Sequence, residues 1–76
     1  MIQISEVNII SIDKSEDSWA IEGEILFDGD LSTPFSVDYF PEYDEFENLE
    51  IEITPGSFDG SALKKMIINA SYDYDE

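Results

Sequence analysis

The stretch WAIEGEILFDGD, residues 19–30, decides the fold of this chain. Large apolar side chains occupy most odd positions between 19 and 27, while Glu22 and Glu24 occupy even positions. This period of two is typical of a β-strand that buries one face and exposes the other. The turn sequence Asp28-Gly29-Asp30 follows at once, and Gly29 can adopt the positive φ that a tight hairpin needs. The stretch therefore predicts a half-buried strand that ends in a hairpin.

Three more strands are predicted around this one. Residues 35–39 alternate apolar and polar side chains after Pro34, a residue that is tolerated at the start of a strand. Residues 46–54 repeat the pattern, with apolar positions 49, 51 and 53 facing inward and glutamates at 50 and 52 facing outward. In residues 2–12 the parity of the isoleucines switches, which predicts either a bulge or a strand buried on both faces. Four strands joined by short turns predict an antiparallel meander.

The last third of the chain fits two patterns. Ser61 follows an Asp-Gly break and is a good helix N-cap, and the apolar residues at 62, 63, 66, 67 and 70 fall on one stripe at helical spacing. Alanine, leucine, lysine and methionine are good helix formers, so we expect a helix over about residues 61–69. Positions 66, 68, 70 and 72 also alternate, which makes a fifth strand the alternative. The acidic tail, residues 72–76, is expected to be frayed.

These elements predict an α+β fold, a small antiparallel four-stranded meander with one C-terminal helix packed on its apolar face. An all-β fold with five strands is the alternative. Residues 1–76 are expected to form a single domain, because a chain of this length has no room for a second core. Five Phe, four Tyr and one Trp supply too much large apolar surface for a chain that stays disordered.

The charge of the chain is strongly one-sided. Nineteen acidic residues stand against three lysines, and the net charge is −16. These charges repel one another in the compact state, so the stability of the fold is expected to rise with salt concentration. Direct binding of nucleic acid is not expected, since affinity for phosphates comes mainly from lysine and arginine, and anionic membranes are disfavoured for the same reason.

The residue types that most enzymes use are scarce. The chain has no histidine, cysteine or arginine, and none of its many carboxylate pairs has a neighbour that would separate the two pKa values. We therefore expect no enzymatic activity and no cofactor, with a carboxylate-based hydrolase as the remaining enzymatic alternative. Residues 28–32 resemble the start of an EF-hand calcium loop. No metal site is expected there, because Thr33 stands where that loop needs glycine and Tyr39 where it needs glutamate.

The compartment is inferred from the absence of cysteine and from the first residues. A chain without cysteine cannot form the disulfides that stabilise many small secreted domains, which favours a reducing compartment. Residues 1–12 contain polar side chains and no basic cluster, so they resemble neither a signal peptide nor a membrane span. A cytoplasmic location is the expectation.

The arrangement of the acids is the one positive signal for function. Acidic residues on three of the predicted strands have outward parity and should leave the same side of the sheet, and residues 42–47 add an acidic loop that carries two aromatic side chains. We expect this negative surface to bind a basic protein partner, as an inhibitor, an immunity-type antidote or a nucleic-acid mimic does. The candidate partner-binding residues are Glu22, Glu24, Asp38, Glu42, Tyr43, Asp44, Glu45, Glu47, Glu50 and Glu52.

Two other interpretations stay open. Acidic outward faces are common on small soluble sheets and can serve solubility alone, although like charges on adjacent strands are destabilising. Alternatively the protein is a structural or assembly protein, a homodimer or larger homo-oligomer, because Leu26 and Phe40 have outward parity and could meet a second copy. Among the aromatic residues, Trp19 is expected in the core, and Tyr43, Phe46 or both are expected to close its end.

Overall fold

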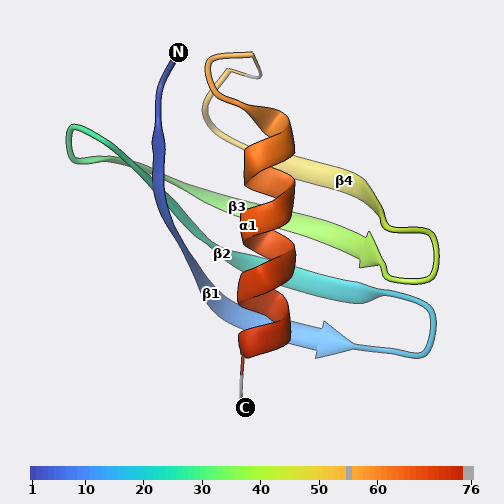
Figure 1. Ribbon diagram of the computed structural model, residues 1–76. Helices are drawn as coiled ribbons and strands as arrows, with labels where there is room; N and C mark the ends of the chain where they lie inside the picture. Colours follow the sequence, from blue (N-terminus) through green and yellow to red (C-terminus); the bar gives the residue numbers. More distant parts are fainter. Residues whose placement is uncertain (55, 75–76) are drawn as a thin grey trace.

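The computed structural model describes residues 1–54 and 56–74, and it has one antiparallel sheet with a single helix across one of its faces (Figure 1). Neighbouring strands follow the chain in the order β1-β2-β3-β4. This arrangement confirms the predicted α+β meander with a C-terminal helix, and the residues considered for a fifth strand are helical. The elements are β1 (Ile4–Lys14), β2 (Trp19–Phe27), β3 (Leu31–Phe40), β4 (Glu45–Ile51) and α1 (Gly60–Asp73).

The hairpin between β2 and β3 forms at the predicted turn. Gly29 and Asp30 adopt φ angles of 84° and 61°, in the left-handed region that glycine and aspartate tolerate best. β3 begins at Leu31, so Pro34 lies inside the strand and not at its start. The proline is tolerated there because the pairing with β4 ends at Phe35, and beyond that point β3 has no strand on that side among the described residues.

Two bulges in β1 accommodate the switches in parity. The register against β2 shifts between Ile4 and Glu6 and again between Ile9 and Ser11. The second shift leaves Ile10 as the extra residue, and its side chain is 69% exposed. Of the two alternatives for residues 2–12, the bulge is therefore confirmed.

β4 is shorter than predicted and is also bulged. Its register against β3 shifts between Ser36 and Asp38, where Asn48 adopts a left-handed φ of 56°. Leu49, predicted to face inward, lies at the rim of the sheet and is 41% exposed. The prediction for this residue fails because a strict period of two assumes that no extra residue enters the strand.

The helix begins one residue before the predicted start. Its N-cap is Asp59 and not Ser61. The Asp59 Oδ1 atom accepts hydrogen bonds from the backbone N–H of Ser61 at 3.0 Å and from that of Ala62 at 3.3 Å. These bonds satisfy two of the peptide groups that a helix leaves unpaired at its first turn.

The helix also ends later than predicted. It continues to Asp73, and the hydroxyl of Tyr74 donates to the carbonyl oxygen of Ile10 at 3.2 Å. Residues 72–74 are thus held on the domain, which differs from the expectation of a frayed tail, whereas the rest of that tail, residues 75 and 76, lies outside the described residues. No helix in the described part of the chain is long and apolar enough to cross a membrane.

The core lies between α1 and the face of the sheet that it covers. Ile25 from β2 and Ile67 from α1 are both 0% exposed, so strand and helix side chains meet with full exclusion of water. Burying an aliphatic side chain of this size contributes about 1.5–3 kcal/mol relative to leaving it in water. Trp19 packs half-buried against this cluster, as predicted. The buried apolar residues are Ile12, Ile21, Ile25, Phe27, Phe35, Val37, Tyr39, Phe58, Leu63 and Ile67.

Candidate partner-binding face

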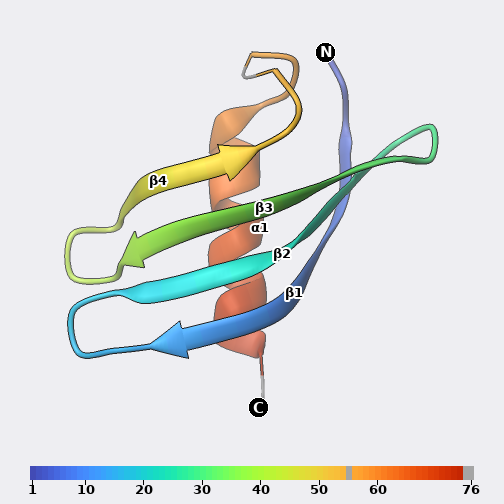
Figure 2. The ribbon, with the colours of Figure 1, turned by 180° about the vertical axis from the view of Figure 1, so that it is seen from behind.

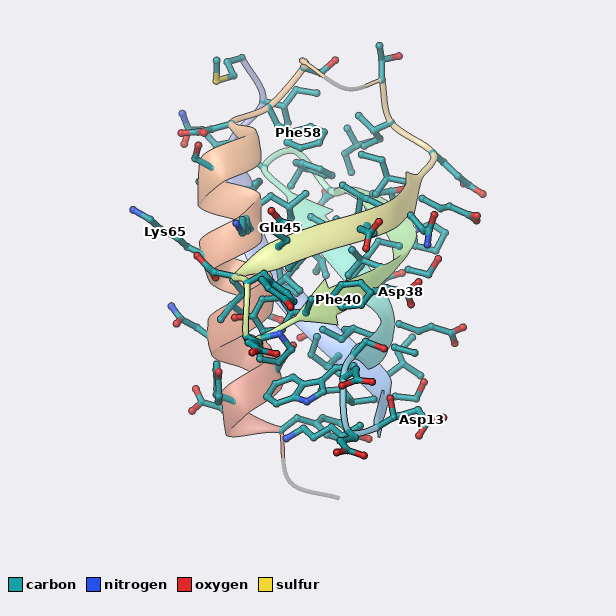
Figure 3. All side chains as sticks on the ribbon, turned by 90° about the vertical axis from the view of Figure 1, so that its right-hand side faces the viewer. Asp13, Asp38, Phe40, Glu45, Phe58 and Lys65 are labelled. Carbon is teal, nitrogen blue, oxygen red and sulfur yellow. The ribbon has the colours of Figure 1, made fainter. Side chains whose placement is uncertain are left out.

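The sheet has one covered face and one open face. α1 crosses the covered face, and no helix among the described residues lies on the opposite face (Figure 2). Successive side chains of a strand point to opposite faces, so the buried odd positions of β2 and β3 leave their even positions on the open face. Figure 3 shows Asp13 and Asp38 on the side of the sheet away from α1, whereas Lys65 extends from α1 in the other direction.

The strand register places the predicted glutamates in rows across the open face. Glu22 pairs with Ser36, and Ser36 pairs in turn with Glu50. Neighbouring strands are about 4.8 Å apart, so the backbones of Glu22 and Glu50 are separated by roughly 10 Å with a serine between them. Glu24, one row further along, pairs with Asn8 on one side and Pro34 on the other. The register therefore separates these like charges, which lowers the repulsion expected from the sequence.

One pair of acids does stand directly opposite. Asp38 pairs with Glu47, the one acidic pair among the strand partners of the described residues. The side-chain amide of Asn48 donates to Asp38 Oδ2 at 3.0 Å. The left-handed bulge at Asn48 thus brings a hydrogen-bond donor to the place where two carboxylates meet, and this contact offsets part of their repulsion.

A shallow hollow of about 470 Å³ lies in the middle of the open face. Its lining includes the carboxylate-bearing residues Glu22, Glu50 and Glu52 together with Ser36 and the exposed side chain of Ile10. The hydroxyl of Thr33, a buried residue of β3, accepts a hydrogen bond from the backbone N–H of Glu52 at 3.1 Å. This bond holds Glu52 beside the sheet beyond the end of β4. The hollow thus combines negative charge with apolar surface.

The acidic face is the part of the open face that these rows and the hollow define. Along each strand its side chains are about 6.6 Å apart, which is the distance between successive outward residues. Its members are Glu22, Glu24, Asp38, Glu47, Glu50 and Glu52.

The remaining predicted residues do not join this face as a group. Asp44 turns to the helix side, where its Oδ1 atom accepts a hydrogen bond from the Tyr39 hydroxyl at 3.3 Å. Glu42 and Tyr43 are exposed in the turn between β3 and β4, and Tyr43 is 68% exposed. Glu45 begins β4 opposite Phe40. Tyr43 therefore does not close the core.

Two acids on the open face were missed by sequence reasoning. Asp13 pairs with Ala20, and Glu6 pairs with Leu26, so both belong to the outward parity of β2. The bulge at Ile10 lies between them and reverses the parity of β1, which is why a fixed alternation cannot assign both residues to one face.

All three lysines lie on the helix side of the sheet. The Nζ atom of Lys14 is 4.3 Å from the centroid of the Trp19 ring, and the Nζ atom of Lys64 is 3.8 Å from Asp44 Oδ2. Lys65 is exposed on α1 (Figure 3). Within residues 1–54 and 56–74, the open face therefore presents carboxylates without a basic side chain to neutralise them.

A row of aromatic rings closes the loop end of the core. Trp19, Tyr39 and Phe46 occupy paired positions on three adjacent strands, with ring centroids 5.7 and 5.6 Å apart and with edge-to-face geometry. Tyr72 of α1 meets the Trp19 ring at 5.1 Å. Phe46 thus takes the core-closing position that the sequence left open between it and Tyr43. Such contacts contribute about 0.5–1.5 kcal/mol each beyond burial.

Tyr39 should make the fold sensitive to alkaline pH. Burial raises the pKa of its hydroxyl from 10.0 to about 12, with further contributions from Tyr72 and from the hydrogen bond to Asp44. The folded state therefore favours the protonated phenol. Its contribution to stability is complete below pH 10 and is lost as the pH rises toward 12.

The measurement is the free energy of unfolding against pH for the parent protein and for Tyr39→Phe. The variant should lack the part of the alkaline decrease that the parent shows in this pH window. Tyr43→Phe removes the same hydroxyl from an exposed ring and is the matched control, so it should retain the decrease. Parallel curves for the parent and Tyr39→Phe would contradict the prediction.

The two apolar residues considered for self-association lie at opposite ends of the open face. Leu26 is next to the β2–β3 turn, and Phe40 is at the other end of β3, and both are half-buried. At about 3.3 Å per residue they are roughly 26 Å apart, with acidic residues between them. They do not form one apolar patch.

The carboxylates of the acidic face do not converge on a common point. In the described part of the chain, no group of three or more Asp and Glu side chains is arranged to hold a metal ion. Spread carboxylates of this kind suit several separate contacts with cationic groups better than one central ligand.

Comparison with known proteins finds no protein-family model, no curated protein and no solved structure that matches this chain. A function for this small acidic α+β protein therefore has to be inferred from the chemistry of its surfaces.

Proposed function

We propose that this protein is a non-enzymatic binding protein whose acidic face docks on a basic macromolecular partner. Inhibitors, immunity-type antidotes and nucleic-acid mimics are forms that such a protein takes. The observation that carries the proposal is the segregation of charge, since every lysine lies on the helix side while the open face presents unneutralised carboxylates. A surface of one sign raises the encounter rate with an oppositely charged partner and disfavours partners of the same sign.

The hollow on the acidic face suits a lysine or arginine side chain of the partner. Glu22, Glu50 and Glu52 supply carboxylate oxygens around it, and Ser36 supplies a hydroxyl between the first two. The exposed side chain of Ile10 offers apolar contact to the aliphatic stem of such a residue. The proposed recognition therefore uses apolar contact and a hydroxyl group in addition to negative charge.

The test is a pull-down from host lysate at low and high salt with the parent protein and with E22Q/E24Q/E50Q/E52Q. Exposed ion pairs contribute about 0.2–1 kcal/mol each, so loss of four should weaken binding about fourfold or more at low salt. High salt should weaken binding of the parent by screening. Binding that ignores salt, or that the quadruple change leaves intact, contradicts the proposal.

A matched control separates the face from the net charge. The variant E16Q/D17N/D28N/D30N removes four negative charges from exposed turns outside the acidic face. Both quadruple variants have a formal net charge of −12, which is −16 plus the four charges removed. The control should bind nearly as well as the parent, and equal losses in the two variants would show that only the total charge matters.

A further inference from the structure

The two edges of the sheet differ in how they are covered. At the β1 edge, α1 packs against the strand and the Tyr74 hydroxyl reaches the carbonyl oxygen of Ile10. β4 is the last strand on the other side, so one of its two rows of peptide N–H and C=O groups has no strand partner among the described residues. An open row of this kind is a template for pairing with another extended chain.

An apolar groove of about 310 Å³ lies beside the β4 edge on the helix side. Phe46, Leu49 and Ile51 line it from β4, and Phe58 and Leu63 line it from the segment before α1 and from α1 itself. Lys64 of α1 also lines it, and its ammonium group lies 3.8 Å from Asp44 Oδ2. Leu49 is 41% exposed because of the bulge, so it offers apolar surface at the rim. The groove therefore presents apolar contacts directly beside the free edge.

The other side of the same edge is acidic. Glu47 and Glu50 pair with outward residues of β3 and belong to the acidic face. A strand added to β4 would direct its side chains alternately to the two faces of the sheet. Every second side chain would then meet the groove, and the side chains between them would meet carboxylates.

We propose that the β4 edge binds an extended segment of the basic partner in which apolar residues alternate with lysine or arginine. This inference rests on the proposed function and names the chemistry of the partner segment. The mode is β-strand addition, in which main-chain hydrogen bonds supply affinity and alternate side chains supply specificity. Asn48 interrupts the ladder with its left-handed φ, so the paired segment is short and centres on the residues beside the groove.

A second copy of the chain does not fit this edge. Two copies paired through β4 would bring their glutamates together, and each copy has a net charge of −16. Like charges across a strand pair are destabilising, whereas a basic segment neutralises them. The charge therefore selects a basic partner over self-association.

The experiment uses two capped synthetic peptides of the same composition, KVKFKVK and KKVFVKK, titrated into the 76-residue protein at low salt. The alternating peptide should bind about fivefold more tightly or better, because only it can place its apolar residues in the groove while its lysines face the carboxylates. A form of the alternating peptide that is N-methylated at alternate peptide nitrogens lacks the N–H groups that would pair with β4. It should therefore bind no more tightly than KKVFVKK, and this comparison uses the parent protein.

Two protein variants locate the site. Leu49→Ser should abolish the preference for the alternating peptide, whereas Leu31→Ser, at a side chain of similar exposure outside the groove, should keep it. Equal affinities for the two peptides in the parent protein, or a dimer of the free chain that Leu49→Ser dissolves, would overturn the inference. The proposed function survives if both peptides bind equally and E22Q/E24Q/E50Q/E52Q weakens both, and it fails if neither peptide binds.

Discussion

Replacing Gly23 with alanine is expected to lower the free energy of unfolding by about 3 kcal/mol or more, a large share of the roughly 4–11 kcal/mol typical of a domain this size. A Cβ atom at this position would lie 2.1 Å from the carbonyl oxygen of Asn8 and 2.9 Å from Cε1 of Phe35. The first of these is a backbone atom of β1. It cannot move away unless the strand itself shifts against β2.

The clash at Gly23 also bears on the acidic face. Phe35 is buried, so its ring has little freedom to yield, and the strain has to pass to β1. Gly23 and Ile10 both line the hollow on the open face. A shift of β1 would therefore alter the hollow, and binding of the proposed basic partner should weaken even in the fraction of Gly23→Ala that stays folded.

Chemical denaturation measures the predicted loss, and Gly60→Ala is the control. A Cβ atom at Gly60 meets no other atom within 4 Å in the described structure, and the residue lies at the start of α1. Alanine there should leave stability unchanged or raise it by up to about 1 kcal/mol. If Gly23→Ala proves as stable as Gly60→Ala, the close approach of β1 and β2 is not as the structure describes it.

Ile67→Ala is expected to cost about 2–5 kcal/mol, the second large effect. The side chain is 0% exposed on the face of α1 that meets the sheet, so its removal leaves a cavity that the rigid sheet cannot fill by collapsing. In a domain of this size each 1 kcal/mol lost lowers the midpoint of thermal unfolding by roughly 4–8 °C. The midpoint of urea denaturation should fall while the slope of the transition stays the same.

Ile10→Ala removes the same side-chain atoms and is the control for Ile67→Ala. Ile10 is 69% exposed, so its truncation should change stability by no more than about 0.5 kcal/mol. Binding of the proposed basic partner should show the opposite order. Ile10→Ala should weaken this binding because Ile10 lines the hollow, whereas folded Ile67→Ala should keep it because Ile67 lies on the other side of the sheet. A comparable loss of stability in both variants would contradict the assignment of the core.

Much of the fold could be predicted because strand geometry repeats every two residues. The parity of β2 and β3 separates buried from exposed positions without any knowledge of the partner strands, and it predicted Glu22 and Glu24 on the open side correctly. The turn at Gly29 was predictable for an equally local reason, since few residues tolerate positive φ. The helix was predictable in kind from its residue types, although its ends were not.

Most of the missed features depend on contacts between side chains that a fixed periodicity does not describe, and the N-cap Asp59 was missed even though its partners Ser61 and Ala62 are close in the chain. The later end of α1 depends on the packing of Tyr72 on Trp19 and on the bond from Tyr74 to Ile10. Asp44 does not join the predicted partner-binding surface because Tyr39 and Lys64 hold its carboxylate on the helix side. No local pattern contains these partners.

The sequence by itself determined the fold class, the excess of negative charge and the presence of a polar face opposite the apolar one. These follow from composition and from the period of two, which are properties of each segment alone. Only the tertiary structure decided where the bulges fall, and therefore which acids share the open face, how serine spaces them, and that a groove lies beside the free edge of β4. The physical reason is that register is set by pairing between strands, and one extra residue reverses the face of every side chain that follows it.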